Sequence, residues 1–225
     1  ILAILILTYV GNWYQLHLRP KSTTATPSIT QVKSGFSKSK IIFALVILLI
    51  LIFSKYFYMA SMTSYFTFYL IDKFGISVQE SQIYLFVFLA SVAVGTILGG
   101  PLGDRYGRKL IIWISILGAA PFTLLLPHVG LTLTLLLSVM IGLIISSAFS
   151  AILVYATELI PGKVGMIAGL FFGLAFGMGG IGSALLGWLA DKTSIEHVFN
   201  ICAYLPLIGI ATGLLPNIER QKKAQ

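Results

Sequence analysis

A lysine inside an apolar stretch is the most informative charged residue of this sequence. Lys55 follows Lys40 by fifteen residues of a mostly apolar run, which corresponds to about 22 Å along an α-helix. A charged lysine near the middle of a bilayer costs roughly 2.5 kcal/mol or more, so it is normally retained for a reason. The position favours either a site for an anion or a structural lysine. A structural lysine would pair with a carboxylate elsewhere or extend along the helix to the membrane surface.

Polar and aromatic side chains recur near Lys55 at steps of three and four residues, namely Ser54, Tyr58, Ser61, Tyr65 and Tyr69. Residues at this spacing share one face of a helix. We expect this face to line a central cavity, in which Lys55 binds a small anionic substrate. Tyr58, Ser61 and Tyr65 would offer hydroxyl donors and ring faces to it. Lys55 could also take part in proton coupling. No acidic residue lies in the middle of an apolar stretch, so a carboxylate that carried the proton would belong to another part of the protein.

A second group of charged residues lies in a glycine-rich stretch, residues 100–109, between two long apolar runs. Its informative members are Gly100, Gly103, Asp104, Arg105, Gly107, Arg108 and Lys109. We expect a tight turn between two membrane helices here. Gly100 and Gly103 would let helices approach closely, and Gly107 would permit the turn.

The charged side chains of this turn suit the ends of neighbouring helices. Asp104 fits near a helix N-terminus, whose dipole favours an anion, and the bases can pair with carboxylates. Glu158 precedes Pro161 at the end of a later apolar stretch and is the natural partner of Arg105 or Arg108. Two alternatives stay open: the bases serve only to orient the protein, and Glu158 is a solvated loop acid.

The composition indicates an integral membrane protein with an all-α fold. Of its 225 residues, 57 % are hydrophobic and 10 % are charged, whereas soluble domains carry about 25 % charged residues. Six apolar segments have roughly the length that crosses a bilayer, and they must be helical because no water satisfies the backbone there. They cover residues 41–71, 78–101, 110–126, 131–156, 164–190 and 198–215.

Three shorter parts flank this six-helix region of residues 41–216. Residues 1–16 are interpreted as the end of a truncated transmembrane helix, residues 17–40 as a basic linker and residues 217–225 as a tail. Twelve of the fifteen Lys and Arg residues fall in the linker, the tail and the loops around Asp104 and Lys163, against two in the opposite loops. The positive-inside rule therefore places the linker and the C-terminus in the cytoplasm.

Small residues recur every fourth position in two segments, as Ser91, Gly95, Gly99 and Gly103 and as Gly165, Gly169, Gly173 and Gly177. Such faces let helices pack closely in lipid. We find no metal-ligand cluster and no nucleophile–base set, so we expect no enzyme, no metal and no cofactor. The bases lie in loops rather than along one face, which argues against a nucleic-acid partner.

The stretch at residues 100–109 matches the signature loop of the major facilitator superfamily of transporters. Residues 187–192 resemble residues 100–105, since both read Gly-x-x-x-Asp followed by a base. The two copies would lie on opposite sides of the membrane, which is the pattern of two inverted three-helix repeats in each half of such transporters.

Four stretches, residues 52–60, 103–109, 147–155 and 169–180, closely resemble the C-terminal half of bacterial fosmidomycin-resistance transporters. The resemblance implies a twelve-helix protein of the bacterial inner membrane that exports a small anionic drug by proton-coupled alternating access. It also implies a missing N-terminal six-helix half as partner, beside protons and the lipid bilayer. Lys55 would bind the phosphonate or hydroxamate end of the drug. The latch residues of the cytoplasmic loop would be Gly100, Asp104, Arg105, Gly107, Arg108 and Glu158.

Two alternatives remain beside drug export. The same fold could move another small organic anion or a sugar-like solute, because fold alone does not determine the substrate. The chain could also be a non-transporting membrane module built from a half-bundle.

Overall fold

The computed structural model describes residues 8–10, 13, 37–160 and 162–216. The chain divides into two compact units, Ile1–Val32 and Lys33–Gln225. In the first unit residues 8–10 and 13 are helical. The rest of the predicted helix end, most of the predicted linker and the tail at residues 217–225 lie outside the described residues.

The regular elements described in the second unit are all helical. They are α2 (Lys38–Phe74), α3 (Val78–Tyr106), α4 (Arg108–Leu117), α5 (Ala120–Leu125), the 3₁₀-helix η1 (Leu126–His128), α6 (Leu131–Ser146), α7 (Ala148–Leu159), α8 (Val164–Lys192), α9 (Ile195–Cys202) and the 3₁₀-helix η2 (Leu205–Leu214). They make six stretches that are long and apolar enough to cross a membrane. This confirms the predicted all-α fold with six membrane-spanning segments.

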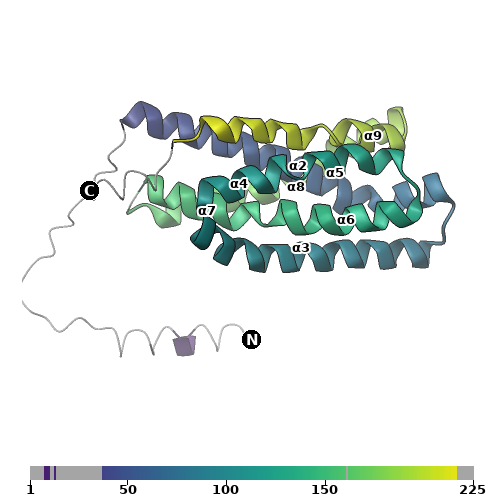
Figure 1. Cartoon of the computed structure of the whole chain (residues 1–225), viewed down its shortest axis with the longest axis horizontal. Helices are drawn as coiled ribbons and strands as arrows, with labels where there is room; N and C mark the ends of the chain where they lie inside the picture. The colour runs from purple at the N-terminus through teal and green to yellow at the C-terminus, as the bar shows by residue number, and fades with distance from the viewer. Residues whose placement is uncertain (1–7, 11–12, 14–36, 161, 217–225) are drawn as a thin grey trace, which may run out of the picture. The chain divides into compact units, whose positions relative to one another are not determined.

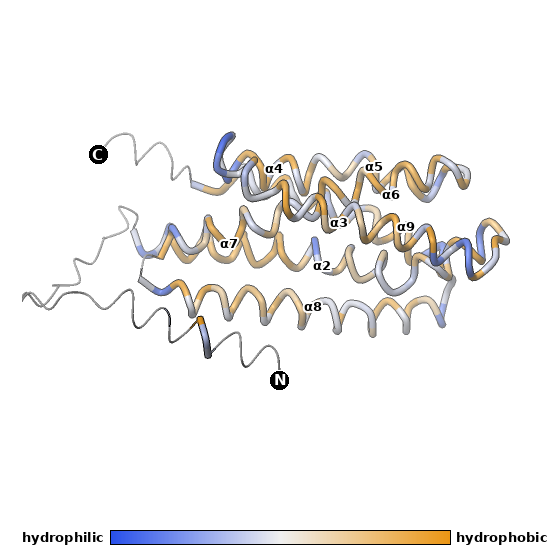
Figure 2. Tube along the Cα trace, turned by 90° about the horizontal axis from the view of Figure 1, so that it is seen from below, coloured by the Kyte–Doolittle hydropathy of each residue, from blue (hydrophilic) through white to orange (hydrophobic). Residues whose placement is uncertain are grey.

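The six stretches lie side by side along a common direction, and the chain reverses between one and the next (Figure 1). Figure 2 shows mostly apolar residues along their lengths and hydrophilic residues gathered near their ends. We call the end with the turns at Gly107 and Gly162 the Arg108 end. The opposite end, with the turns at Gly75 and Gly130, is the Lys73 end.

At the Lys73 end, local sequence signals determine where α2 stops and where α3 starts. Gly75 terminates α2 in the left-handed conformation, with φ at 64°, which glycine adopts without steric cost. Ser77 and Glu80 form a capping box at the start of α3, so the first free N–H groups of that helix are satisfied. The turn between the first two spans is therefore encoded locally.

Small residues bring α3 against α6 and α7. A Cβ atom added at Gly99 would lie 2.7 Å from the Cα of Ser147, and one added at Gly142 would lie 3.1 Å from the carbonyl oxygen of Phe88. The close packing predicted for the second apolar segment is thus confirmed. The prediction for the fifth segment is wrong in the described structure, since Gly165, Gly169, Gly173 and Gly177 have no neighbour within 4 Å of an added Cβ.

The predicted turn at residues 100–109 is mostly helix. α3 continues through Pro101 to Tyr106, and Gly107 alone leaves the helical conformation, with φ at 96°. The prediction for Gly107 is therefore confirmed, but the prediction that Gly100 allows close approach is wrong: no atom lies within 4 Å of an added Cβ there. Successive residues of a helix point about 100° apart, so Gly99 faces the neighbouring helices and Gly100 does not.

Candidate functional site

Lys55 lies on α2 between two buried apolar clusters. The first cluster includes α2 residues up to Ile52 and packs around Ile112 and Ile152. The second begins at Tyr58 and packs around residues such as Phe66 and Phe88. Lys55 itself is only 4 % exposed, so the bundle encloses a cation at the boundary between two parts of its core.

The ammonium group of Lys55 has few partners for a buried charge. Its Nζ donates to the backbone carbonyl of Ser146 at 3.4 Å and lies 5.3 Å from the ring centroids of both Tyr56 and Phe149. Among the residues described here it forms no ion pair with a carboxylate. An ammonium group carries three donors, so hydrogen-bonding capacity remains for an anion.

Other hydroxyl groups lie near the same level of the bundle. Ser54 donates to the carbonyl of Leu205 at 2.6 Å, and Ser115 and Ser147 share a buried hydrogen bond. The first bond joins α2 to the last span, and the second joins α4 to the residue between α6 and α7. The lysine therefore belongs to a polar layer that crosses an otherwise apolar bundle.

The remaining predicted binding residues lie on the buried side of α2. Tyr58 is 2 % exposed and Ser61 is fully buried, and the Ser61 hydroxyl donates to the Tyr58 carbonyl at 2.7 Å. Tyr65 is half-buried and its hydroxyl donates to the carbonyl of Ser183 on α8 at 2.6 Å. The structure places all of these on one helix, as the spacing indicated, but Tyr58 and Ser61 face the helices of the bundle.

Two grooves border α2 and α8. One has a volume of about 390 Å³ and is lined by Tyr56, Met59, Ala60, Thr63, Ser64, Ala175, Phe176, Gly179, Gly180 and Ser183. The other, of about 310 Å³, is lined by Phe53, Phe57, Leu185, Leu186, Trp188, Leu189, Ile201, Cys202 and Leu205. We call them the hydroxyl groove and the apolar groove.

The rings at Lys55 and the residues of the hydroxyl groove were not predicted as site residues. Tyr56 adjoins Lys55 in sequence, and Phe149 falls inside one of the stretches that carry the family resemblance. Neither position marks a contact by itself, because the contact depends on how α2 packs against α7 and α8. Proximity in sequence to a buried charge was the one usable signal.

At the Arg108 end, one guanidinium joins three helices. Arg108, the first residue of α4, bonds Asp104 of α3 at 3.1 Å and forms an ion pair with Glu158 of α7. We call these three residues the Arg108 cluster. Arg108 at a helix N-terminus and Glu158 near a C-terminus both oppose the helix dipoles, so each compensates the other. The contact predicted between Glu158 and a base of the loop is present, with Arg108.

Two other bases of this loop have different neighbours from those predicted. The guanidinium of Arg105 lies 5.4 Å from the ring centroid of Tyr106, and it forms no ion pair with a residue that the structure describes. Lys109 donates to the backbone carbonyls of Gly213, at 3.1 Å, and Leu215. The prediction that Lys109 pairs with a carboxylate is wrong here, because the carbonyls at the end of η2 accept hydrogen bonds from its ammonium instead.

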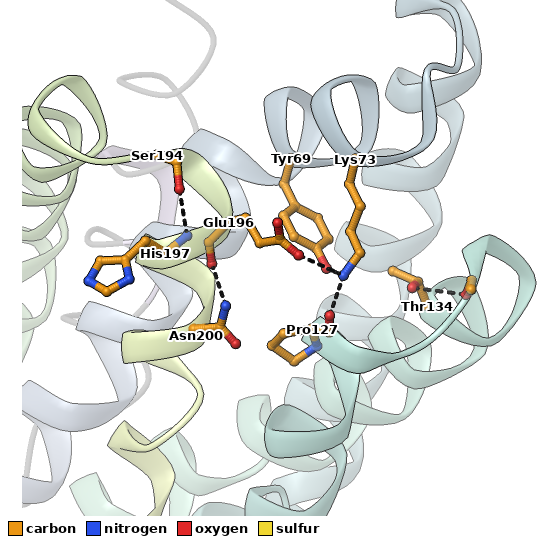
Figure 3. A network of polar contacts seen from close by, with 9 residues as sticks. Tyr69, Lys73, Pro127, Thr134, Ser194, Glu196, His197 and Asn200 are labelled. Carbon is orange, nitrogen blue, oxygen red and sulfur yellow. Dashed lines mark hydrogen bonds and ion pairs between the residues drawn. The ribbon is translucent and has the colours of Figure 1, made fainter.

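The Lys73 end carries a second ionic network (Figure 3). Lys73 of α2 lies 3.2 Å from Glu196 of α9 and 3.1 Å from the hydroxyl of Tyr69, and it also donates to the carbonyl of Pro127 in η1. These bonds connect the first, third and sixth spans at their ends. Within the ranges that the structure describes, no group of three or more His, Cys, Asp or Glu residues could hold a metal.

Comparison with known proteins adds to this geometry. A model described as Major Facilitator Superfamily matches residues 1–182 and 44–225. The chain is 56 % identical over 222 residues to the fosmidomycin resistance protein of Escherichia coli (strain K12), a match that covers 96 % of this chain and 53 % of that protein. It is 38 % identical over 222 residues to the uncharacterized MFS-type transporter YfnC of Bacillus subtilis (strain 168), covering 99 % of this chain and 54 % of that protein.

A more distant relative is the benzoate transport protein of Acinetobacter baylyi (strain ATCC 33305 / BD413 / ADP1), at 30 % identity over 151 residues. That match covers 65 % of this chain and 32 % of the relative. The chain spans about half the length of the first two relatives. Since the superfamily model matches most of the chain and the six apolar helices agree with it, this chain belongs to the Major Facilitator Superfamily of membrane transporters, and it is not an enzyme.

Proposed function

We propose that this protein is a secondary active transporter that exports a small organic anion by proton-coupled alternating access, with fosmidomycin as a substrate. The observation that carries the proposal is the buried Lys55 ammonium, which has no carboxylate partner among the described residues. A buried cation is retained in a membrane protein chiefly where it binds or moves something. The relative at 56 % identity is named for fosmidomycin resistance, and fosmidomycin carries an anionic phosphonate.

Lys55 is the group that we assign to the acid end of the substrate. Tyr65 lies at the boundary between α2 and α8, where a bound molecule could reach it. Lys55, Tyr58 and Ser61 are all enclosed by the bundle, so their contact with a substrate requires α2 to move relative to its neighbours. In this proposal they act in a different conformational state from the one described.

The Arg108 cluster is the proposed latch of the transport cycle. Its ion pairs hold the ends of α3, α4 and α7 together, and their rupture and re-formation would allow these helices to separate and close. Gly107 supplies the turn between the first two of them. We place Gly100, which is half-buried, and Arg105, which is exposed, in the same latch, where they could meet the N-terminal six-helix half.

The same proposal includes the location of the protein. We infer a multi-pass protein of the bacterial inner membrane, with the Arg108 end, the linker of residues 17–40 and the tail of residues 217–225 in the cytoplasm. The excess of Lys and Arg on that side supports this orientation.

Drug susceptibility tests the proposal directly. A fosmidomycin-sensitive bacterium would express the complete reading frame that encodes this chain, beside an empty vector, and drug efflux would be followed with and without collapse of the proton gradient. We expect resistance that disappears with the gradient. Sensitivity despite confirmed membrane insertion would refute fosmidomycin as the substrate.

The role of Lys55 is tested by substitution at matched membrane abundance. We expect Lys55→Ala to abolish resistance and Lys55→Arg to retain part of it, because the charge is kept but its shape changes. Lys192→Ala is the matched control, since Lys192 is exposed at the end of α8. Full resistance in Lys55→Ala would exclude the lysine from substrate binding.

A second candidate substrate class is a small aromatic acid. The rings of Tyr56 and Phe149 each lie 5.3 Å from the Lys55 ammonium, and one relative is named a benzoate transport protein. Benzoate transport in the same cells separates the classes: transport of benzoate with unchanged fosmidomycin sensitivity would favour the aromatic acid.

A further inference from the structure

We propose that the hydroxyl groove between α2 and α8 holds the body of the transported anion while Lys55 holds its acid group. This inference rests on the proposed function and narrows its substrate class. The substrate is an elongated organic anion with an apolar body and a hydrogen-bond donor at its far end. Three features of the groove carry the inference: its continuity with Lys55, the chemistry of its lining and its dimensions.

A continuous track of aromatic rings joins Lys55 to the groove. Tyr56 lies 5.3 Å from the Lys55 ammonium and also lines the groove. Phe149, also 5.3 Å from the ammonium, packs edge-on against Tyr56 at 5.9 Å and against Phe172 at 5.0 Å, and Phe172 stacks with Phe176 at 6.4 Å. Phe176 is again a residue of the groove wall. Lys55 is itself buried and outside the groove lining, so a molecule anchored there, once helix movement exposes the ammonium, would enter the groove over these ring surfaces.

The lining of the groove suits a hydrogen-bond donor. The Thr63 hydroxyl donates to the carbonyl of Met59 at 2.9 Å, and the Ser183 hydroxyl donates to the carbonyl of Gly180 at 2.9 Å. Their protons are thus committed, while their oxygen lone pairs remain able to accept. Ser64 adds a third, exposed hydroxyl.

The contrast with the apolar groove indicates what each surface faces. The apolar groove has no hydroxyl side chain in its lining, as a surface that meets lipid tails should. The hydroxyl groove instead presents three hydroxyl oxygens, those of Thr63, Ser64 and Ser183, that can accept hydrogen bonds from a ligand. The hydroxyl groove therefore suits a polar ligand path rather than lipid.

The dimensions of the groove suit a short chain or a single ring. Tyr56 and Thr63 are seven residues apart on α2, which corresponds to about 10 Å. Gly179 and Gly180 leave the α8 wall without side chains, and Phe176, 75 % exposed, forms an edge. The volume of about 390 Å³ lies at the small end of the range for ligand sites.

Competition between two phosphonates tests the subsite. Fosmidomycin transport would be measured in everted membrane vesicles that carry the complete protein, with methylphosphonate or 3-hydroxypropylphosphonate as competitor. Methylphosphonate offers the acid group alone, whereas the longer probe adds a carbon chain and a terminal hydroxyl. We expect the longer probe to compete about tenfold better in the wild type, because its chain is buried and its hydroxyl is bonded.

Filling the groove should remove this advantage. Gly180→Leu places a side chain in the groove without a clash, since nothing lies within 4 Å of an added Cβ. We expect it to lower the advantage of the longer probe to near unity while leaving methylphosphonate unchanged. Gly177→Leu is the matched control: it is equally open but lies outside the groove lining, so it should keep the wild-type ratio.

Thr63→Val provides a second variant that keeps the shape of the side chain. It should weaken 3-hydroxypropylphosphonate but not propylphosphonate, which lacks the hydroxyl. Either of two results overturns the subsite. One is an unchanged ratio of 3-hydroxypropylphosphonate to methylphosphonate competition in Gly180→Leu. The other is equal weakening of 3-hydroxypropylphosphonate and propylphosphonate in Thr63→Val, which would show that Thr63 does not bond the hydroxyl of the longer probe. Failure of the wild type to transport fosmidomycin refutes the proposed function itself, a result that is distinct from either.

Discussion

Two adjacent glycines of α3 should respond in opposite ways to the same substitution. Gly99 is buried, and an alanine Cβ there would lie 2.5 Å from the carbonyl oxygen and 2.7 Å from the Cα of Ser147. Both are backbone atoms of a packed helix end, so they cannot move aside without shifting α6 and α7. Gly100 is half-buried and has no neighbour within 4 Å of an added Cβ.

The magnitudes follow from these distances. Overpacking of this kind typically costs about 1–3 kcal/mol, while replacing a helical glycine with alanine gains about 1 kcal/mol in helix propensity. Gly99→Ala should therefore lower the free energy of unfolding by up to about 2 kcal/mol, and Gly100→Ala should raise it by up to about 1 kcal/mol. The difference between the variants, about 2 kcal/mol, is a factor of about 30 in the unfolding equilibrium.

Reversible unfolding in mixed detergent micelles measures this difference. Both variants would be purified in the same detergent, and unfolding would be followed by circular dichroism as the denaturing detergent is increased. Equal stability of Gly99→Ala and Gly100→Ala would refute the close contact between α3 and Ser147. It would also mean that close helix packing does not explain the row of small residues from Ser91 to Gly99 on α3.

Further predictions concern three polar contacts. Glu158→Gln should lower the free energy of unfolding by less than about 1 kcal/mol, because its pair with Arg108 is partly exposed. If the Arg108 cluster is a latch, the same variant should reduce transport about tenfold. Unfolding and efflux assays on one preparation check both, and unchanged transport would refute the latch. Lys73→Met should lower the free energy of unfolding by about 0.5–1 kcal/mol at low salt. The loss should shrink at 1 M salt, because salt screens the ion pair with Glu196. An identical loss at both salt concentrations would assign the effect to packing. Tyr65→Phe should lower stability by about 1 kcal/mol, since it removes a hydrogen bond to the α8 backbone; unchanged unfolding would show that the bond contributes nothing net.

The latch contact illustrates how far motif reasoning reaches. The sequence predicts Glu158 and the bases of residues 105–109 on the same side of the membrane, because two spans, an even number, lie between them along the chain. Sequence reasoning offered both Arg105 and Arg108 as partners of Glu158. The structure shows Arg108, since it begins α4 and faces α7, whereas Arg105 lies over Tyr106.

The extent of α3 was outside the reach of that reasoning. Glycine, proline and several charges between two apolar runs are typical of a loop, and residues 100–109 were interpreted in that way. The helix nevertheless continues to Tyr106. Gly99 packs against Ser147 and holds this part of α3 along its neighbours, so a tertiary contact outweighs the local preference.

The sequence by itself determined the class of protein and the number of its spans, because a bilayer interior requires helices of a certain length and apolar composition. It also identified Lys55 as unusual, since a charge in the middle of a long apolar segment is costly in a bilayer. Only the tertiary structure decided what Lys55 contacts, which glycines are packed and which face of α2 borders a groove. These properties depend on the rotation of each helix about its axis relative to its neighbours, and a rotation of one residue position, about 100°, changes every contact.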